Sequence, residues 1–106
     1  MILVHKVFLS EPAKKDLGAL LTILQRGEIL GHQDSSPMKT LARGCFELRL
    51  RGADGIYRAF YLIKSEIGII VFHAFKKKTQ KTPLQEIETG RRRLHFCLQE
   101  LKNEEN

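Results

Sequence analysis

The feature that most constrains the fold is a run of three strand-like segments between residues 45 and 75, joined by short glycine-containing turns. The first segment, CFELRLR, alternates apolar and polar side chains, which is typical of a strand with one buried and one hydrated face. IYRAFYLIK and IIVFHAF follow it, and the last is almost wholly apolar. The turns GADG and SEIG are of the kind that joins neighbouring strands. We therefore expect a three-stranded antiparallel meander.

The residues before the meander predict a strand, a helix and a loop. ILVHKVFL, residues 2–8, reads as a strand at a sheet edge or paired with a later strand. A helix should begin at Ser10, carry Pro12 in its first turn and stop near Gly27. The polar segment 31–44 predicts a loop with a short helical turn.

The residues after the meander predict a final helix. Thr82 is placed to cap it and Gln85 to complete a capping box, while Gly90 weakens its middle and the tail from about residue 102 should fray. These elements predict one α+β domain over residues 1–106.

Length and composition limit the class of protein. A chain of 106 residues builds one compact domain, and no uninterrupted apolar stretch approaches the roughly 20 residues of a membrane helix. The start lacks the basic and small-residue features of a signal peptide, so we expect no membrane partner and a cytoplasmic location. Cys45 and Cys97 stand far apart, which favours two buried free thiols. Without a metal-ligand cluster, phosphate-binding glycine loop or nucleophile elbow, we expect neither metal nor cofactor.

Positive charge is concentrated in the second half of the chain. The net charge is +6, from 18 Lys and Arg and 12 Asp and Glu. Residues 43–93 hold twelve basic and five acidic side chains, whereas 1–42 hold five and four, and 94–106 hold one and three. Such a distribution is typical of a surface that meets RNA, DNA or an acidic protein. A hydrated face that only aids solubility is the alternative.

The side chains with chemical capacity are mostly cations, with two aromatics and one histidine. In the predicted meander they come from neighbouring strands and converge on one surface. The set is Arg49, Arg51, Tyr57, Arg58, Tyr61, His73, Lys76, Lys77, Lys78 and Lys81. It suits cleavage of RNA by the strand's own 2′-hydroxyl, because guanidinium groups stabilise the phosphorane while a lysine, tyrosine or histidine relays protons.

Each candidate also has a structural explanation. The arginines of the first meander strand fit outward charges on an exposed face equally well. The two tyrosines fit sheet packing better than base stacking, and a lone histidine in an apolar strand is more often a core residue than a catalyst. The lysine run fits a hydrated loop, and the run from Arg91 to Arg93 fits a hydrated helix face or a remote phosphate contact.

The stretch from Gly44 to Arg93 resembles the toxins of type II toxin-antitoxin modules in the RelE/ParE superfamily, and among them the phage-derived HigB-like branch. The specific parts are the ELRLR strand, the YRAFY strand and FHAFKKKTQKTP with an arginine-rich helix after it. The resemblance implies a RelE-like α+β fold, in which the N-terminal strand and a helical segment pack on a twisted antiparallel sheet. It also implies a metal-independent endoribonuclease, an mRNA interferase that arrests translation. The implied partners are the ribosome, its mRNA and a cognate antitoxin with an acidic segment and often a helix-turn-helix.

Carried over by position, the resemblance places the catalytic cations on Arg49, Arg58 and Lys78. Glu47 stands where RelE itself has a lysine, and no tyrosine follows Lys81, so His73 or Lys77 is left to transfer protons. The remaining RNA-binding positions are Arg51, Tyr57, Lys76, Lys81, Arg91 and Arg92. Two other functions stay open: a ParE-like toxin directed at gyrase, which the basic residues disfavour, and a non-catalytic nucleic-acid-binding module.

Overall fold

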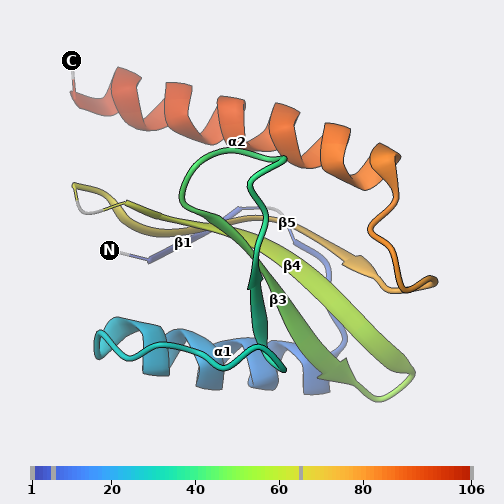
Figure 1. Ribbon diagram of the computed structural model, residues 1–106. Helices are drawn as coiled ribbons and strands as arrows, with labels where there is room; N and C mark the ends of the chain where they lie inside the picture. The colour runs from blue at the N-terminus through green and yellow to red at the C-terminus, as the bar shows by residue number, and fades with distance from the viewer. Residues whose placement is uncertain (1, 6, 65, 106) are drawn as a thin grey trace.

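The computed structural model describes residues 2–5, 7–64 and 66–105 and places a mixed sheet between two helices (Figure 1). The strands are β1 (Ile2–Val4), β2 (Ser35–Pro37), β3 (Cys45–Gly52), β4 (Gly55–Lys64) and β5 (Gly68–Lys76), in the spatial order β1-β5-β4-β3-β2. The helices are α1 (Glu11–Gln25) and α2 (Leu84–Glu105). The predicted α+β class, with a C-terminal helix packed on the sheet, is confirmed.

The predicted meander forms from β3, β4 and β5. β3 and β4 pair antiparallel as far as Gly52 and Gly55, which leaves a two-residue hairpin turn between them. β4 and β5 also pair antiparallel, with a register shift between Phe60 and Tyr61. β1 joins β5 in parallel at the other edge of the sheet, so the sheet is mixed, whereas the resemblance implied an antiparallel sheet.

The first strand is shorter than the predicted range of 2–8. β1 ends at Val4, and the backbone N–H of His5 makes one more bond, 2.8 Å long, to the carbonyl of Val71. The register shift of β5 follows directly after Val71, and such an irregularity bends a strand away from a straight neighbour. Residue 6 of the predicted strand lies outside the described residues.

The segment 31–44 contains a strand that the sequence did not predict. β2 pairs antiparallel with β3 and forms one edge of the sheet. Its residues, Ser-Ser-Pro, show no apolar alternation, and Pro37 is tolerated because an edge strand needs no donor on its outer side. The hydroxyl of Ser35 lies 2.7 Å from that of Tyr61, so a buried polar contact stabilises this strand.

Each face of the sheet is covered by one helix (Figure 1). Leu48 and Leu50 of β3 pack with the leucines of α1. On the opposite face Phe60 and Phe72 pack with Leu94 and other residues of α2. Both cysteines are free and buried, as predicted, and burial raises the pKa of the Cys45 thiol to about 11.

The ends of the helices follow the sequence signals in part. α1 carries Pro12 in its first turn and ends before Gly27, which adopts φ 79° as a helix-terminating glycine does. α2 starts directly after Pro83 and continues to Glu105, through the residues expected to fray. The predicted capping role of Thr82 is wrong, because its hydroxyl bonds to side chains of the sheet. In the described part of the chain neither helix is long and apolar enough to span a membrane.

Candidate nucleic-acid interface

The lysines that follow β5 line a groove against the first turn of α2. The groove has a volume of about 430 Å³, and its wall is formed by Phe75, Lys76, Lys77, Lys78, Thr79, Pro83, Gln85 and Glu86. We call it the lysine groove. Lys77 is half-buried and Lys78 exposed, so cationic groups stand along one side of a concave surface. Concave basic walls focus the electric potential and attract polyanions.

A carboxylate and an imidazole meet at the α2 side of the lysine groove. Nε2 of His73 lies 2.9 Å from Oε1 of Glu86, while the side chains are 6% and 30% exposed, respectively. A carboxylate only accepts hydrogen bonds, so the imidazole donates from Nε2. Nδ1 of His73 is buried without a partner, which suits the unprotonated nitrogen of a neutral ring.

Burial lowers the pKa of His73 below its ordinary value. The hydrogen bond to Glu86 opposes this effect, whereas the positive charges of Arg93 and Arg92 add to it. The ring is therefore neutral at pH 7, and it positions the carboxylate without carrying charge. The ring is tilted against Phe60 of β4 and stacks on Phe75 of its own strand, with ring centroids 5.7 and 5.6 Å away, respectively.

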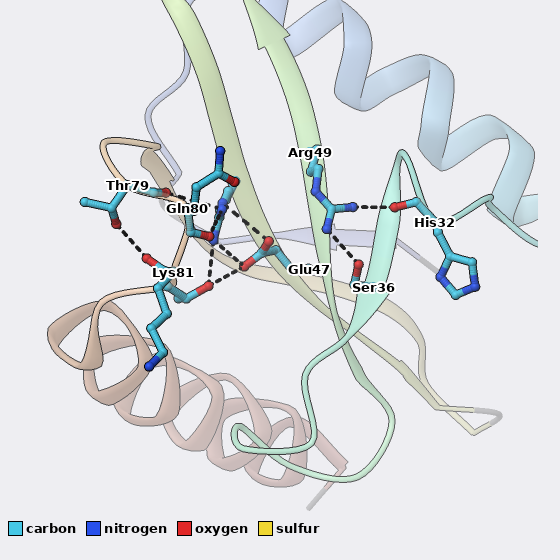
Figure 2. Close-up of polar contacts among 9 residues, drawn as sticks. His32, Ser36, Glu47, Arg49, Thr79, Gln80 and Lys81 are labelled. Carbon is cyan, nitrogen blue, oxygen red and sulfur yellow. Dashed lines mark hydrogen bonds and ion pairs between the residues drawn. The ribbon is translucent and has the colours of Figure 1, made fainter.

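Arg58 lies beneath the basic loop and is almost completely buried. One terminal nitrogen donates to the hydroxyl of Thr82 at 2.7 Å, and the other to the carbonyl of Gln80 at 2.6 Å. Its Nε lies 3.4 Å from Oε1 of Glu47, at ion-pair distance but without hydrogen-bond geometry. Thr82 in turn donates to Glu47 at 2.8 Å. Figure 2 shows residues 79–81 beside Glu47, and these bonds fasten the loop to the sheet.

This arrangement corrects one expectation about β3. The period of two predicted that Glu47, Arg49 and Arg51 point to a hydrated face, but Glu47 is only 4% exposed. The loop after β5 covers this part of the face, and the guanidinium of Arg58 compensates the buried carboxylate. The terminal nitrogens of Arg58 thus donate to groups inside the protein.

Arg49 lies directly opposite Arg58 in the β3–β4 ladder, as the predicted convergence requires. In Figure 2 its side chain points toward His32 and Ser36, in and beside β2. Its terminal nitrogens donate to the carbonyl of His32 at 2.5 Å and to the hydroxyl of Ser36 at 2.8 Å. Arg49 is half-buried.

Two other candidates make exposed contacts near the hairpin turn. The hydroxyl of Tyr57 donates to Asp54 at 3.1 Å, and Nζ of Lys76 reaches the same carboxylate at 3.1 Å. These bonds, first from Lys76 and then from Tyr57, lower the pKa of Asp54. Arg51 is exposed and lies 3.4 Å from Asp34, on the other edge of β3.

The remaining candidates are dispersed along the loop and α2. Lys81 is exposed, and its carbonyl accepts a bond of 2.6 Å from the hydroxyl of Thr79. Arg91 binds the carbonyl of Thr40 and so connects α2 with the 38–44 segment. Arg92 reaches Thr89 on its own helix at 3.2 Å. These arginines lie outside the lysine groove.

Sequence reasoning missed Glu86 as part of this site. The available signal was an acidic side chain in the first turn after Pro83, in a segment otherwise rich in lysine and arginine. Its contact with His73 spans 13 residues and depends on how α2 packs over β5. Within the described residues, no three His, Cys, Asp or Glu side chains are grouped so that they could hold a metal ion.

The family model described as phage-derived protein Gp49-like (DUF891) matches residues 8–95. The chain belongs to this family. The Gp49-like region contains the whole meander, the lysine groove and the first half of α2. The phage-derived origin implied by the resemblance in sequence is thereby supported at the level of the family. A search of curated proteins found no match.

Proposed function

We propose that this Gp49-like protein is the toxin of a bacterial type II toxin-antitoxin pair, and that it arrests translation by cutting mRNA on the ribosome. The observation that carries the proposal is the lysine groove, in which cations face a carboxylate held by a neutral imidazole. The α+β fold and the phage-derived family agree with it.

The groove supplies what RNA cleavage by a 2′-hydroxyl requires. The ammonium groups of Lys77 and Lys78 can bind the phosphate and stabilise the extra negative charge of the phosphorane. The attacking hydroxyl belongs to the RNA, so positioning and charge supply much of the catalysis. The proposal therefore includes a metal-independent endoribonuclease that works in the cytoplasm, where its ribosome, mRNA and antitoxin partners are found.

One observation favours a second candidate, a nucleic-acid-binding module that does not cut RNA. Arg58, the cation that the resemblance makes catalytic, gives its terminal donors to Thr82 and to loop carbonyls. If no other cation replaces it, the surface binds phosphate without stabilising the transition state. The two candidates differ in product, because only the first leaves cut RNA.

The test is primer extension on a defined message after adding the protein to a purified translation system. The toxin proposal predicts site-specific cuts in the presence of ribosomes and none on naked RNA. Bound but intact message would support the second candidate. Both candidates would be overturned if the message stayed intact and the protein did not bind ribosomes, while the same protein still arrested the growth of cells. That combination would indicate a different target such as gyrase.

A further inference from the structure

Glu86 combines three properties that suit it to act on a ligand in the lysine groove. It lines the lysine groove, it sits in the first turn of α2, and it keeps 30% of its side chain exposed. Lys77 and Lys78 line the same groove, so a phosphodiester bound by their ammonium groups would lie next to this carboxylate.

His73 fixes where the carboxylate points. It donates from Nε2 to Oε1 at 2.9 Å, and its own buried ring packs against Phe60 and Phe75. The bond uses one oxygen of Glu86 and leaves the second oxygen to accept a proton. Since His73 is only 5% exposed, it reaches the groove through Glu86 and not directly.

We propose that Glu86 is the general base of RNA cleavage in the lysine groove and that His73 is its positioning residue. This inference rests on the proposed function. Glu86 takes the proton of the 2′-hydroxyl as the 2′-oxygen forms a bond to phosphorus. The bond from phosphorus to the 5′-oxygen breaks, and an ammonium of the groove gives that oxygen a proton. The products are a 2′,3′-cyclic phosphate and a 5′-hydroxyl, with no oxidant or other reactant required.

A purely structural role for Glu86 makes different predictions. An acidic side chain in the first turn favours the helix through the dipole, and its contact with His73 connects α2 to β5. Glu86→Gln keeps an oxygen that can accept the bond from His73 but removes the ability to take up a proton. The substitution therefore separates proton transfer from packing.

The experiment measures single-turnover cleavage of ribosome-bound mRNA across a range of pH, with Glu88→Gln as the matched control. Glu88 lies two residues further along α2 and is exposed. Its substitution makes the same change in net charge without touching the groove. Charged groups that face the His73–Glu86 pair also affect the pH profile, because they change the electric potential at the pair. They are Lys76, Lys77 and Lys78 from the groove and Arg92 and Arg93 from α2.

We expect Glu86→Gln to lower the cleavage rate about 100-fold or more, as is typical when a general base is lost. Its profile should also lack the decline on the acid side that protonation of a base produces. Glu88→Gln should cleave like the wild type. His73→Phe should lower the rate of cleavage. His73→Gln, whose amide can donate to the carboxylate, should cleave faster than His73→Phe when the two variants melt at the same temperature.

Retention of wild-type rate and pH profile by a folded Glu86→Gln variant would overturn the inference while leaving the proposed function intact. Failure of the wild type itself to cut ribosome-bound mRNA would overturn both. Circular dichroism and thermal melting of each variant identify any loss that comes from unfolding. If Glu86→Gln melts early, Glu86→Met, which also lacks a group that can take up a proton, serves as the second variant, and a wild-type rate with an unchanged profile there would equally contradict the assignment.

Discussion

Arg58 and Glu47 form an ion pair in which both side chains are only 5% exposed, with Nε of the arginine 3.4 Å from Oε1 of the glutamate. The pair lies under the loop that carries the lysines, and Thr82 of that loop bonds to both partners. The position of the basic loop relative to the sheet therefore depends on a buried charge pair.

Removing one partner of this pair should destabilise the protein strongly. Arg58→Ala leaves the Glu47 carboxylate buried without compensation, which typically costs about 3–5 kcal/mol in free energy of unfolding. Arg51→Ala is the control, because that side chain is 61% exposed and its ion pairs should contribute about 0–1 kcal/mol. Urea unfolding of both variants measures the difference. Equal stabilities would mean that the buried pair is not what holds the loop.

Replacing both partners with apolar residues should recover much of the loss. Buried ion pairs exchanged for hydrophobic residues of similar volume are often neutral or stabilising, so Arg58→Met with Glu47→Leu should unfold at higher urea than Arg58→Ala alone. The double variant also separates a direct role of Arg58 on the RNA from its role in holding the loop. If it is stable and still active, Arg58 acts through the loop and not on the RNA.

Two glycines in helices should respond in opposite directions to substitution by alanine. At Gly90 of α2 a Cβ atom would lie 2.8 Å from Cδ2 of Phe60, so overpacking should cost about 1–3 kcal/mol. At Gly18 of α1 nothing lies within 4 Å, and the better helix propensity of alanine should stabilise by about 0.5–1 kcal/mol. Thermal melting compares the two. Stabilisation by Gly90→Ala would contradict the close packing of α2 on Phe60.

These results show which parts of the molecule were predictable from sequence. The meander was predictable because Leu48 and Leu50 alternate with polar residues, and the end of α1 because Gly27 follows its last turn. β2 was not, since its stability comes from pairing with β3 and from the Ser35–Tyr61 contact.

The candidate site was predictable in composition but not in arrangement. The run of lysines that lines the groove could be recognised in the sequence, because its residues are consecutive. Thr82 and Glu47 are 35 residues apart, and no local signal indicates that their side chains bond. Buried networks of this kind arise from tertiary packing. The same packing brings Arg58 to the carbonyl of Gln80 and Glu86 to His73.

His73 should make stability depend on pH. Burial lowers its pKa in the folded state, so the unfolded state binds a proton first as the pH falls below about 6.5. The contribution of His73 to the free energy of unfolding is complete above that pH. Between that pH and the pKa of the folded state it declines as the pH falls, by up to about 1.4 kcal/mol per pH unit. Urea unfolding at several pH values checks this. His73→Phe should show a smaller decline, and His32→Gln, at an exposed position, should match the wild type.

RNA binding should weaken steeply with added salt, because contacts to phosphates release counterions. For single strands each phosphate contact contributes about 0.7 to the slope of log affinity against log salt, so Lys77→Ala with Lys78→Ala should reduce that slope by about 1.4. Filter binding at several salt concentrations gives the slope. An unchanged slope in this variant would place the RNA on another surface.

The most direct test of the central claim, that the lysine groove is where RNA is cut, is primer extension on ribosome-bound mRNA with groove variants. Lys77→Ala with Lys78→Ala removes two cations from the groove, and Lys102→Ala removes one from the last turn of α2 as control. We predict that the wild type and Lys102→Ala cut the message at the same positions and that the double variant, folded by circular dichroism, leaves it intact. Undiminished cutting by the double variant would contradict the account.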